Sequence, residues 1–182
     1  MTVSPMSKAA LHKRLATAAS AELIETLLGV LATTPTRLRD LSENLSDEAL
    51  TRPLGEGERS FKRDLTHIIY CAERGTIPIY YALTAKEPLM PRIHAERQWG
   101  KLLRYESFAL PDLFAYFTFN RRALLNVLHG LTPQQWERTT QPEGKKRGES
   151  VYYAARGLCV HEYGHLEDLT GKMEKLRAGL FG

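Results

Sequence analysis

Apolar residues recur at helical spacing in four long stretches of the chain. Apolar positions three and four residues apart gather on one face of a helix. The pattern therefore predicts four amphipathic helices, with Ser60 and Ser150 as the N-caps of the second and the fourth. The predicted helices cover residues 21–45, 61–84, 111–128 and 151–176.

The connections between these stretches decide how the helices run. Pro35 interrupts the first apolar stripe, and we expect it to kink that helix or to restart it with Thr34 as the cap. Segment 86–107 is long for a loop, and it is expected to hold a short helix around residues 94–103. A crossover of this length argues against a simple up-down-up-down bundle and allows the second and third helices to run parallel. Residues 132–148 are expected to form a loop.

Length and composition indicate one globular domain. The chain has 182 residues, enough for one well-buried core and short for two. We expect a lead-in over residues 1–19 and one helical domain over residues 20–182. No run of 18 apolar residues exists, so no membrane span is expected, and the N-terminal segment lacks the apolar region of a secretory signal. The two cysteines are expected to be reduced thiols of a cytoplasmic protein.

The charge balance does not indicate nucleic-acid binding. The net charge is +4 and the isoelectric point is about 9.1. The basic residues are scattered, with local clusters at residues 92–104 and 145–147, and neither cluster resembles a nucleic-acid-binding motif. A solvated basic surface explains the charge without such a partner.

The candidate chemistry lies in the fourth stretch, where His161, Glu162 and His165 form the pattern H-E-x-x-H. Histidines four apart on a helix point the same way from consecutive turns and can share one metal ion. Zinc proteases use this pattern. One branch of them needs a third histidine six residues further on, where this chain has Gly171. Few residues remain after the motif, so a third ligand must come from upstream.

All three polar residues of the motif fall on or beside the apolar stripe of their helix. Ionisable groups on such a stripe are costly to bury without partners, and a metal ion would satisfy them. This favours metal binding over a hydrogen-bonded polar patch. In the second stretch, His67 falls at the edge of the apolar arc, which leaves open whether it faces inward, and Cys71 falls further in. Asn120 lies on the third stripe and is expected to be a structural hydrogen bonder rather than a site residue.

Four motifs, taken in order, resemble those of the DinB-like family of metal-binding four-helix bundles, also called the YfiT-like metal-dependent hydrolases. Residues 57–68 resemble the family's G-E-W-S-x-x-x-x-L-x-H-L, although Arg59 stands where the family has Trp. Residues 117–125 match F-x-x-x-R-x-x-L-L. Residues 131–136 match L-T-x-x-x-W, and residues 161–165 match the final H-E-x-x-H. The resemblance covers roughly residues 20–176.

The resemblance implies an all-α fold, a four-helix bundle running up-down-down-up with a long crossover between helices two and three. Carried over by position, it implies that His67, His161 and His165 are the ligands of a divalent metal ion, zinc or nickel and otherwise iron. It thereby supports an inward-facing His67. A homodimer is the expected assembly.

The function implied by the resemblance is a metal-dependent enzyme that acts on a small molecule. It would be a hydrolase, in which the metal activates water and Glu162 is the candidate base. Alternatively it would be a transferase that uses a low-molecular-weight thiol, whose carboxylates the basic residues would bind. The second class of function is a non-catalytic, stress-related metal-binding bundle.

Overall fold

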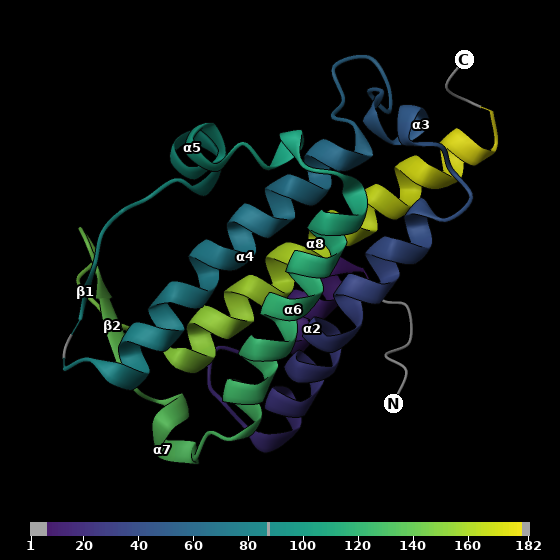
Figure 1. Ribbon diagram of the computed structural model, residues 1–182. Coiled ribbons are helices and arrows are strands. Elements are labelled where there is room, and N and C mark those ends of the chain that lie inside the picture. Colours follow the sequence, from purple (N-terminus) through teal and green to yellow (C-terminus); the bar gives the residue numbers. More distant parts are fainter. Residues whose placement is uncertain (1–6, 87, 180–182) are drawn as a thin grey trace.

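Four long helices dominate the computed structural model, which describes residues 7–86 and 88–179 (Figure 1). In Figure 1, α2 and α8 run in one direction while α4 and α6 run in the other, so the chain passes up, down, down and up through the bundle. The predicted fold class is therefore confirmed. The four helices are α2 (Ala21–Ser42), α4 (Phe61–Thr84), α6 (Leu110–His129) and α8 (Val151–Arg177).

Three of the four helices begin at a serine. The hydroxyl oxygens of Ser20, Ser60 and Ser150 each accept a hydrogen bond from the backbone N–H three residues on. These bonds satisfy N–H groups that have no partner within the helix. The two predicted caps, Ser60 and Ser150, are therefore observed.

Pro35 does not divide the first helix. α2 is one helix through Pro35, and Thr34 is a buried interior residue rather than a cap. The Thr34 hydroxyl donates to the carbonyl of Val30, one turn earlier. The buried apolar face of α2, which includes Leu31 and Leu38, keeps the helix packed on both sides of the proline. Burial of these side chains outweighs the one backbone hydrogen bond that proline removes.

The core lies between the four helices. α4 packs most extensively on α8, α8 also packs on α2, and α2 packs on α6. Side chains completely removed from solvent occur on three of the four helices, with Leu27 and Leu31 on α2, Leu65 and Ile68 on α4, and Ala155 on α8. The α4–α8 seam is the one that carries the candidate chemistry.

The crossover between α4 and α6 holds short elements. The short helix expected around residues 94–103 is observed as a π-helical turn, η1 (Glu96–Gly100), followed by α5 (Lys101–Leu103) and the 3₁₀ turn η2 (Tyr105–Ser107). Strand β1 (Leu89–Met90) pairs in parallel with β2 (Thr139–Pro142), which pairs antiparallel with β3 (Glu149–Ser150). The sequence did not predict these strands, because segments of two to four residues are too short to show alternation.

Three further short helices surround the bundle: α1 (Lys8–Arg14), α3 (Asp47–Thr51) and α7 (Pro133–Trp136). The last of these lies in the segment expected to be a loop. None of the helices in the described residues is long and apolar enough to cross a membrane.

Helix α1 lies within the predicted lead-in and packs on α8. Leu11 and Leu15 are completely buried. Arg156 of α8 is itself buried and donates from Nε to the carbonyl of Leu15 at 2.6 Å and from Nη2 to that of His12 at 3.2 Å. The residues preceding Ser7 lie outside the described part of the chain.

We predict that Arg156→Met lowers the free energy of unfolding by about 1–3 kcal/mol, because the buried carbonyl of Leu15 and the partly buried carbonyl of His12 lose their donor while the apolar bulk is kept. Urea denaturation measures the loss, and amide hydrogen exchange over residues 8–16 should accelerate. The control is Arg122→Met on the exposed side of α6. Equal losses in the two variants would show that Arg156 does not hold α1.

A candidate metal centre of three histidines

Three imidazoles meet across the seam between α4 and α8. His165 Nε2 lies 3.2 Å from His67 Nε2 and 3.2 Å from His161 Nε2. The three ligand nitrogens all lie within 4.8 Å of one another. The two histidines of α8 come from consecutive turns, and α4 supplies the third from the facing helix. The structure thus turns His67 inward, which the spacing of apolar residues had left open.

The two distances from His165 Nε2 match what a metal ion requires. Tetrahedral zinc holds imidazole nitrogens at about 2.0–2.1 Å, which places neighbouring ligand nitrogens about 3.3 Å apart. A hydrogen-bonded cluster explains the spacing less well, because His165 Nε2 can carry only one proton and faces two other nitrogens. The donor set therefore fits a divalent transition metal.

All three imidazoles favour the neutral form, the form that binds metals. Burial is the largest cause in each case and lowers the pKa of His67, His161 and His165 below the usual 6.5. For His161 the pKa falls to about 4, and His165, Lys8 and Arg74 add to the effect of burial. Glu96 acts in the opposite direction on His67.

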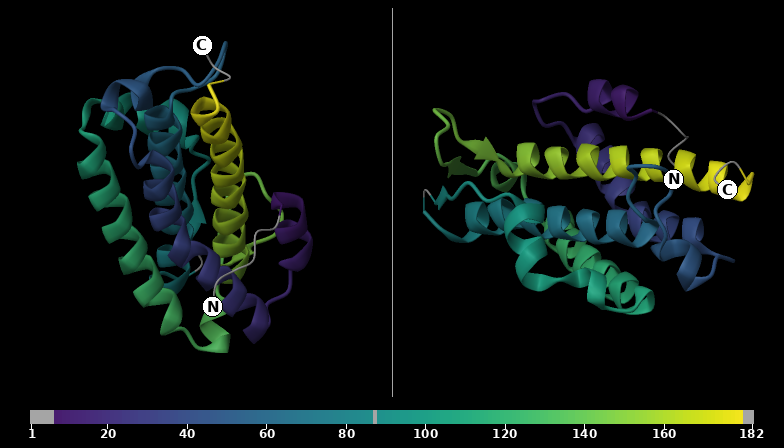
Figure 2. Two further views of the ribbon diagram at one scale, coloured as in Figure 1. Left: turned by 90° about the vertical axis from the view of Figure 1, so that its right-hand side faces the viewer. Right: turned by 90° about the horizontal axis from the view of Figure 1, so that it is seen from above.

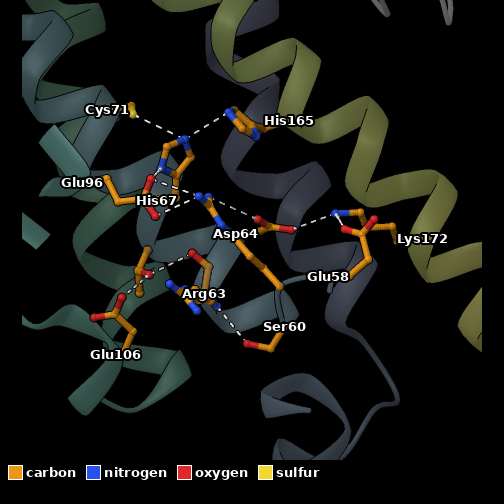
Figure 3. A network of polar contacts seen from close by, with 12 residues as sticks. Glu58, Ser60, Arg63, Asp64, His67, Cys71, Glu96, Glu106, His165 and Lys172 are labelled. Atoms are coloured by element: carbon orange, nitrogen blue, oxygen red, sulfur yellow. Dashed lines mark hydrogen bonds and ion pairs between the residues drawn. The ribbon is translucent and has the colours of Figure 1, made fainter. Parts of the chain in front are cut away.

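A chain of ion pairs runs from His67 to the N-terminal end of α4 (Figure 3). Glu96 Oε2 lies 3.4 Å from His67 Nδ1, without an aligned hydrogen bond. Arg59 forms an ion pair with Glu96 at 2.8 Å and lies 3.8 Å from Asp64. Lys172 of α8 contacts Asp64 at 3.4 Å and Glu58 at 2.7 Å. These ion pairs fix the carboxylate that faces the outer nitrogen of His67.

Sequence reasoning missed Glu96 as a site residue. It lies in the crossover, where periodicity gives no information on the path of the chain. One signal was available, because Arg59 is the position at which the chain departs from the family pattern. An arginine at this position is expected to pair with a nearby carboxylate, and in the structure Arg59 pairs with Glu96 and Asp64.

Glu162 points away from the three nitrogens and into the bundle. Its side chain is completely buried and accepts a hydrogen bond from Arg121 Nη2 of α6 at 2.5 Å. Burial raises the pKa of Glu162 while Arg121 lowers it. Both residues retain buried atoms without a hydrogen-bond partner among the described residues, Glu162 Oε2 and Arg121 Nε and Nη1.

Cys71 lies beside the cluster and outside it. Its Sγ is 3.7 Å from His67 Nε2, one helical turn away, and the side chain is half-buried. Burial raises the pKa of this thiol to about 11, so it stays protonated at neutral pH. Asn120 is only half-buried and lines a cavity, so the expectation of a core hydrogen bonder is not met.

We predict that the metal-free protein loses stability as the pH falls from about 6.5 toward 4. The unfolded chain binds protons on these histidines below a pKa of about 6.5, whereas the folded chain resists them because its histidine pKa values are lowered. Each excluded proton lowers the free energy of unfolding by at most about 1.4 kcal/mol per pH unit.

Urea denaturation with a chelator present measures this slope. His161→Ala should flatten it, whereas His129→Asn, which changes an exposed histidine, should not. Parallel curves for the original chain and His161→Ala would contradict the prediction.

Comparison with known proteins supports the family suggested by the motifs. The solved structure of YfiT from Bacillus subtilis superposes with a TM-score of 0.77 over 92% of this chain and 93% of that one, at 20% sequence identity. YfiT is described as a probable metal-dependent hydrolase with an unusual four-helix bundle topology. No curated protein matches the sequence. The family model of the DinB superfamily matches residues 31–169, and the chain therefore belongs to the DinB superfamily.

Proposed function

We propose that the chain binds one divalent metal ion through the Nε2 atoms of His67, His161 and His165, and uses it to act on a small molecule. The observation that carries the proposal is the convergence of three imidazole nitrogens within 4.8 Å of one another, with two of the three distances at 3.2 Å. Zinc and nickel suit this donor set best, and iron is the third candidate. When bound, such an ion supplies a Lewis acid for polarising an electrophile.

The outer groups of the site suit the role of holding ligands in place. A metal-binding histidine usually donates its other ring N–H to a carboxylate or carbonyl, which fixes the tautomer and the ring. Glu96 lies where it can do this for His67, and Arg59 holds Glu96. In this arrangement Nδ1 carries the proton and Nε2 is left free as a donor to the metal.

Positive side chains near the site suit an anionic substrate. Gly164 lies between the two histidines of α8 in the sequence. The Lys8 side chain packs against this glycine so closely that a Cβ added there would lie 2.9 Å from Lys8 Nζ. Lys8 and Arg74 both act electrostatically on His161. A carboxylate or phosphate on the substrate would be attracted to these cations.

Two reactions are compatible with this site. One is hydrolysis, the activity suggested for YfiT. The other is transfer to or from a low-molecular-weight thiol, whose carboxylates would meet Lys8 and Arg74. A panel of anionic esters and amides tests the first, and an electrophilic acceptor offered with glutathione, bacillithiol or mycothiol tests the second. A non-catalytic bundle would turn over neither set with metal loaded.

The role of Glu162 as a general base stays a prediction. Its buried contact with Arg121 is compatible with a second role, holding the turn of α8 between the two histidines. The pH–rate profile of Glu162→Gln separates these roles, because loss of a base removes the limb on the acidic side. Loss of a positioning contact lowers the rate at every pH.

Homodimerisation also stays a prediction, and sedimentation equilibrium tests it.

We predict about one metal ion per chain in the purified protein or after incubation with zinc or nickel, and a large loss in His161→Ala. Elemental mass spectrometry of protein prepared alongside measures both. His129→Ala is the matched control on an exposed histidine. If both the original chain and the control remain empty after incubation, the metal-binding proposal is wrong.

We also predict that Glu96→Gln weakens metal binding about 10- to 100-fold, because the amide orients His67 less strongly than the carboxylate does. Competition with a chelating dye measures the affinity. The control is Glu137→Gln, an exposed residue after α7. Equal affinities for the two variants would show that Glu96 does not support the site.

A further inference from the structure

A cavity lies between α4 and α6, and residues of η1 and α5 also line it. Its volume is about 450 Å³, within the range of small-molecule sites. The lining side chains come mainly from about three turns of α4 and two turns of α6, among them Ile69, Ala72, Glu73, Thr76, Phe117 and Asn120.

This α4–α6 cavity is separate from the three histidines. Ala72 and Thr76 line the cavity, whereas His67 and Cys71 belong to another face of α4, about 140° around the helix at 100° per residue. In the right-hand view of Figure 2, α8 lies on one side of α4 while α5 and α6 lie on the other. A ligand in the cavity would therefore not contact the imidazoles.

The mouth of the cavity is apolar and accessible. Leu102 of α5 is 77% exposed and Tyr80 of α4 is 37% exposed, and Trp99 of η1 also lines the cavity. Apolar side chains gathered at the rim of a cavity mark a place where apolar surface is buried on binding. The body of a ligand for this cavity is therefore apolar.

Glu73 gives the cavity a negative charge. Its Oε1 accepts hydrogen bonds from the hydroxyls of Tyr105, at 2.7 Å, and Tyr116. Among the described residues Glu73 forms no ion pair. The cation that also lines the cavity, Arg121, is already paired with Glu162. The lining thus carries one carboxylate whose charge no neighbouring cation balances.

We propose that the α4–α6 cavity binds a small organic cation, an apolar body carrying an ammonium group that pairs with Glu73. The rings of Trp99 and Tyr80 line the same space, and aromatic rings attract cations. Phe117 adds apolar surface, because its ring already carries the guanidinium of Arg121, 5.2 Å from the ring centre. The Asn120 side chain adds a polar group to the lining. This site is independent of the metal centre and adds to the function proposed there.

Three ligands with one carbon skeleton test the choice of charge: phenylbutylamine, phenylbutanol and phenylbutyrate. Each is titrated into metal-free protein at neutral pH, and the fluorescence of Trp99 reports binding. The second tryptophan, Trp136, is buried in α7 and serves as the internal background, so Trp99→Phe should abolish the response. We expect the ammonium to bind at least about tenfold more tightly than the alcohol, and the carboxylate more weakly than either.

Two variants test the residues. Glu73→Gln keeps an oxygen acceptor for the two tyrosines and should remove the preference for the ammonium over the alcohol. Ala123→Phe fills the cavity from an exposed position on α6 and should weaken all three ligands. His161→Ala should leave ammonium binding unchanged, which separates this site from metal coordination. Thermal melts of each variant confirm folding.

Three outcomes would overturn the proposal. The first is that the alcohol or the carboxylate binds as tightly as the ammonium. The second is that folded Glu73→Gln retains the preference. The third is that no ligand changes the fluorescence of Trp99, which is also the result expected if a second copy of the chain covers the cavity.

Discussion

Packing of α4 on α8 is the constraint on which the candidate metal centre depends. His67 meets the two histidines of α8 only if these helices keep their register along the seam, because a shift of one turn, about 5.4 Å, would separate the nitrogens. Several contacts hold that register. The buried side chains of Leu65 and Ile68 lie on one helix, and Lys172 of the other reaches Asp64. Burying three imidazoles costs free energy, and the packing of α4 on α8, the most extensive in the bundle, offsets that cost.

The same helix, α8, separates two kinds of polar chemistry. His161 and His165 lie in the seam with α4, whereas Glu162 points inward to Arg121 of α6. A buried glutamate–arginine pair is costly to assemble and more costly to break, because one unpaired charge would remain. The pair therefore ties α6 to the turn of α8 that carries both histidines. It also neutralises the cation beside the α4–α6 cavity, which leaves Glu73 to set the charge there.

The sequence predicted the four helices, their order and the pair His161–His165, because each depends on local spacing along one helix. The inward position of His67 rested on family resemblance, since a residue at the edge of an apolar arc can face either way. Periodicity could not place Glu96 beside His67, because its position depends on the path of the crossover. The cavity was missed for a similar reason. Asn120 lies on an apolar stripe, yet that part of the stripe lines the cavity instead of packing against a neighbouring helix.

The donor set bears on whether the metal would be catalytic or structural. Structural zinc sites are closed by four protein ligands, whereas catalytic sites keep three and leave a position open. Here three imidazoles converge, and the one thiol nearby, Cys71, lies outside their cluster. Cations of Lys8 and Arg74 act on the same site, which a structural ion would not need and an anionic substrate would use. A metal held by these three histidines would have one protein ligand fewer than a closed structural zinc site, which fits the proposed role on a small molecule.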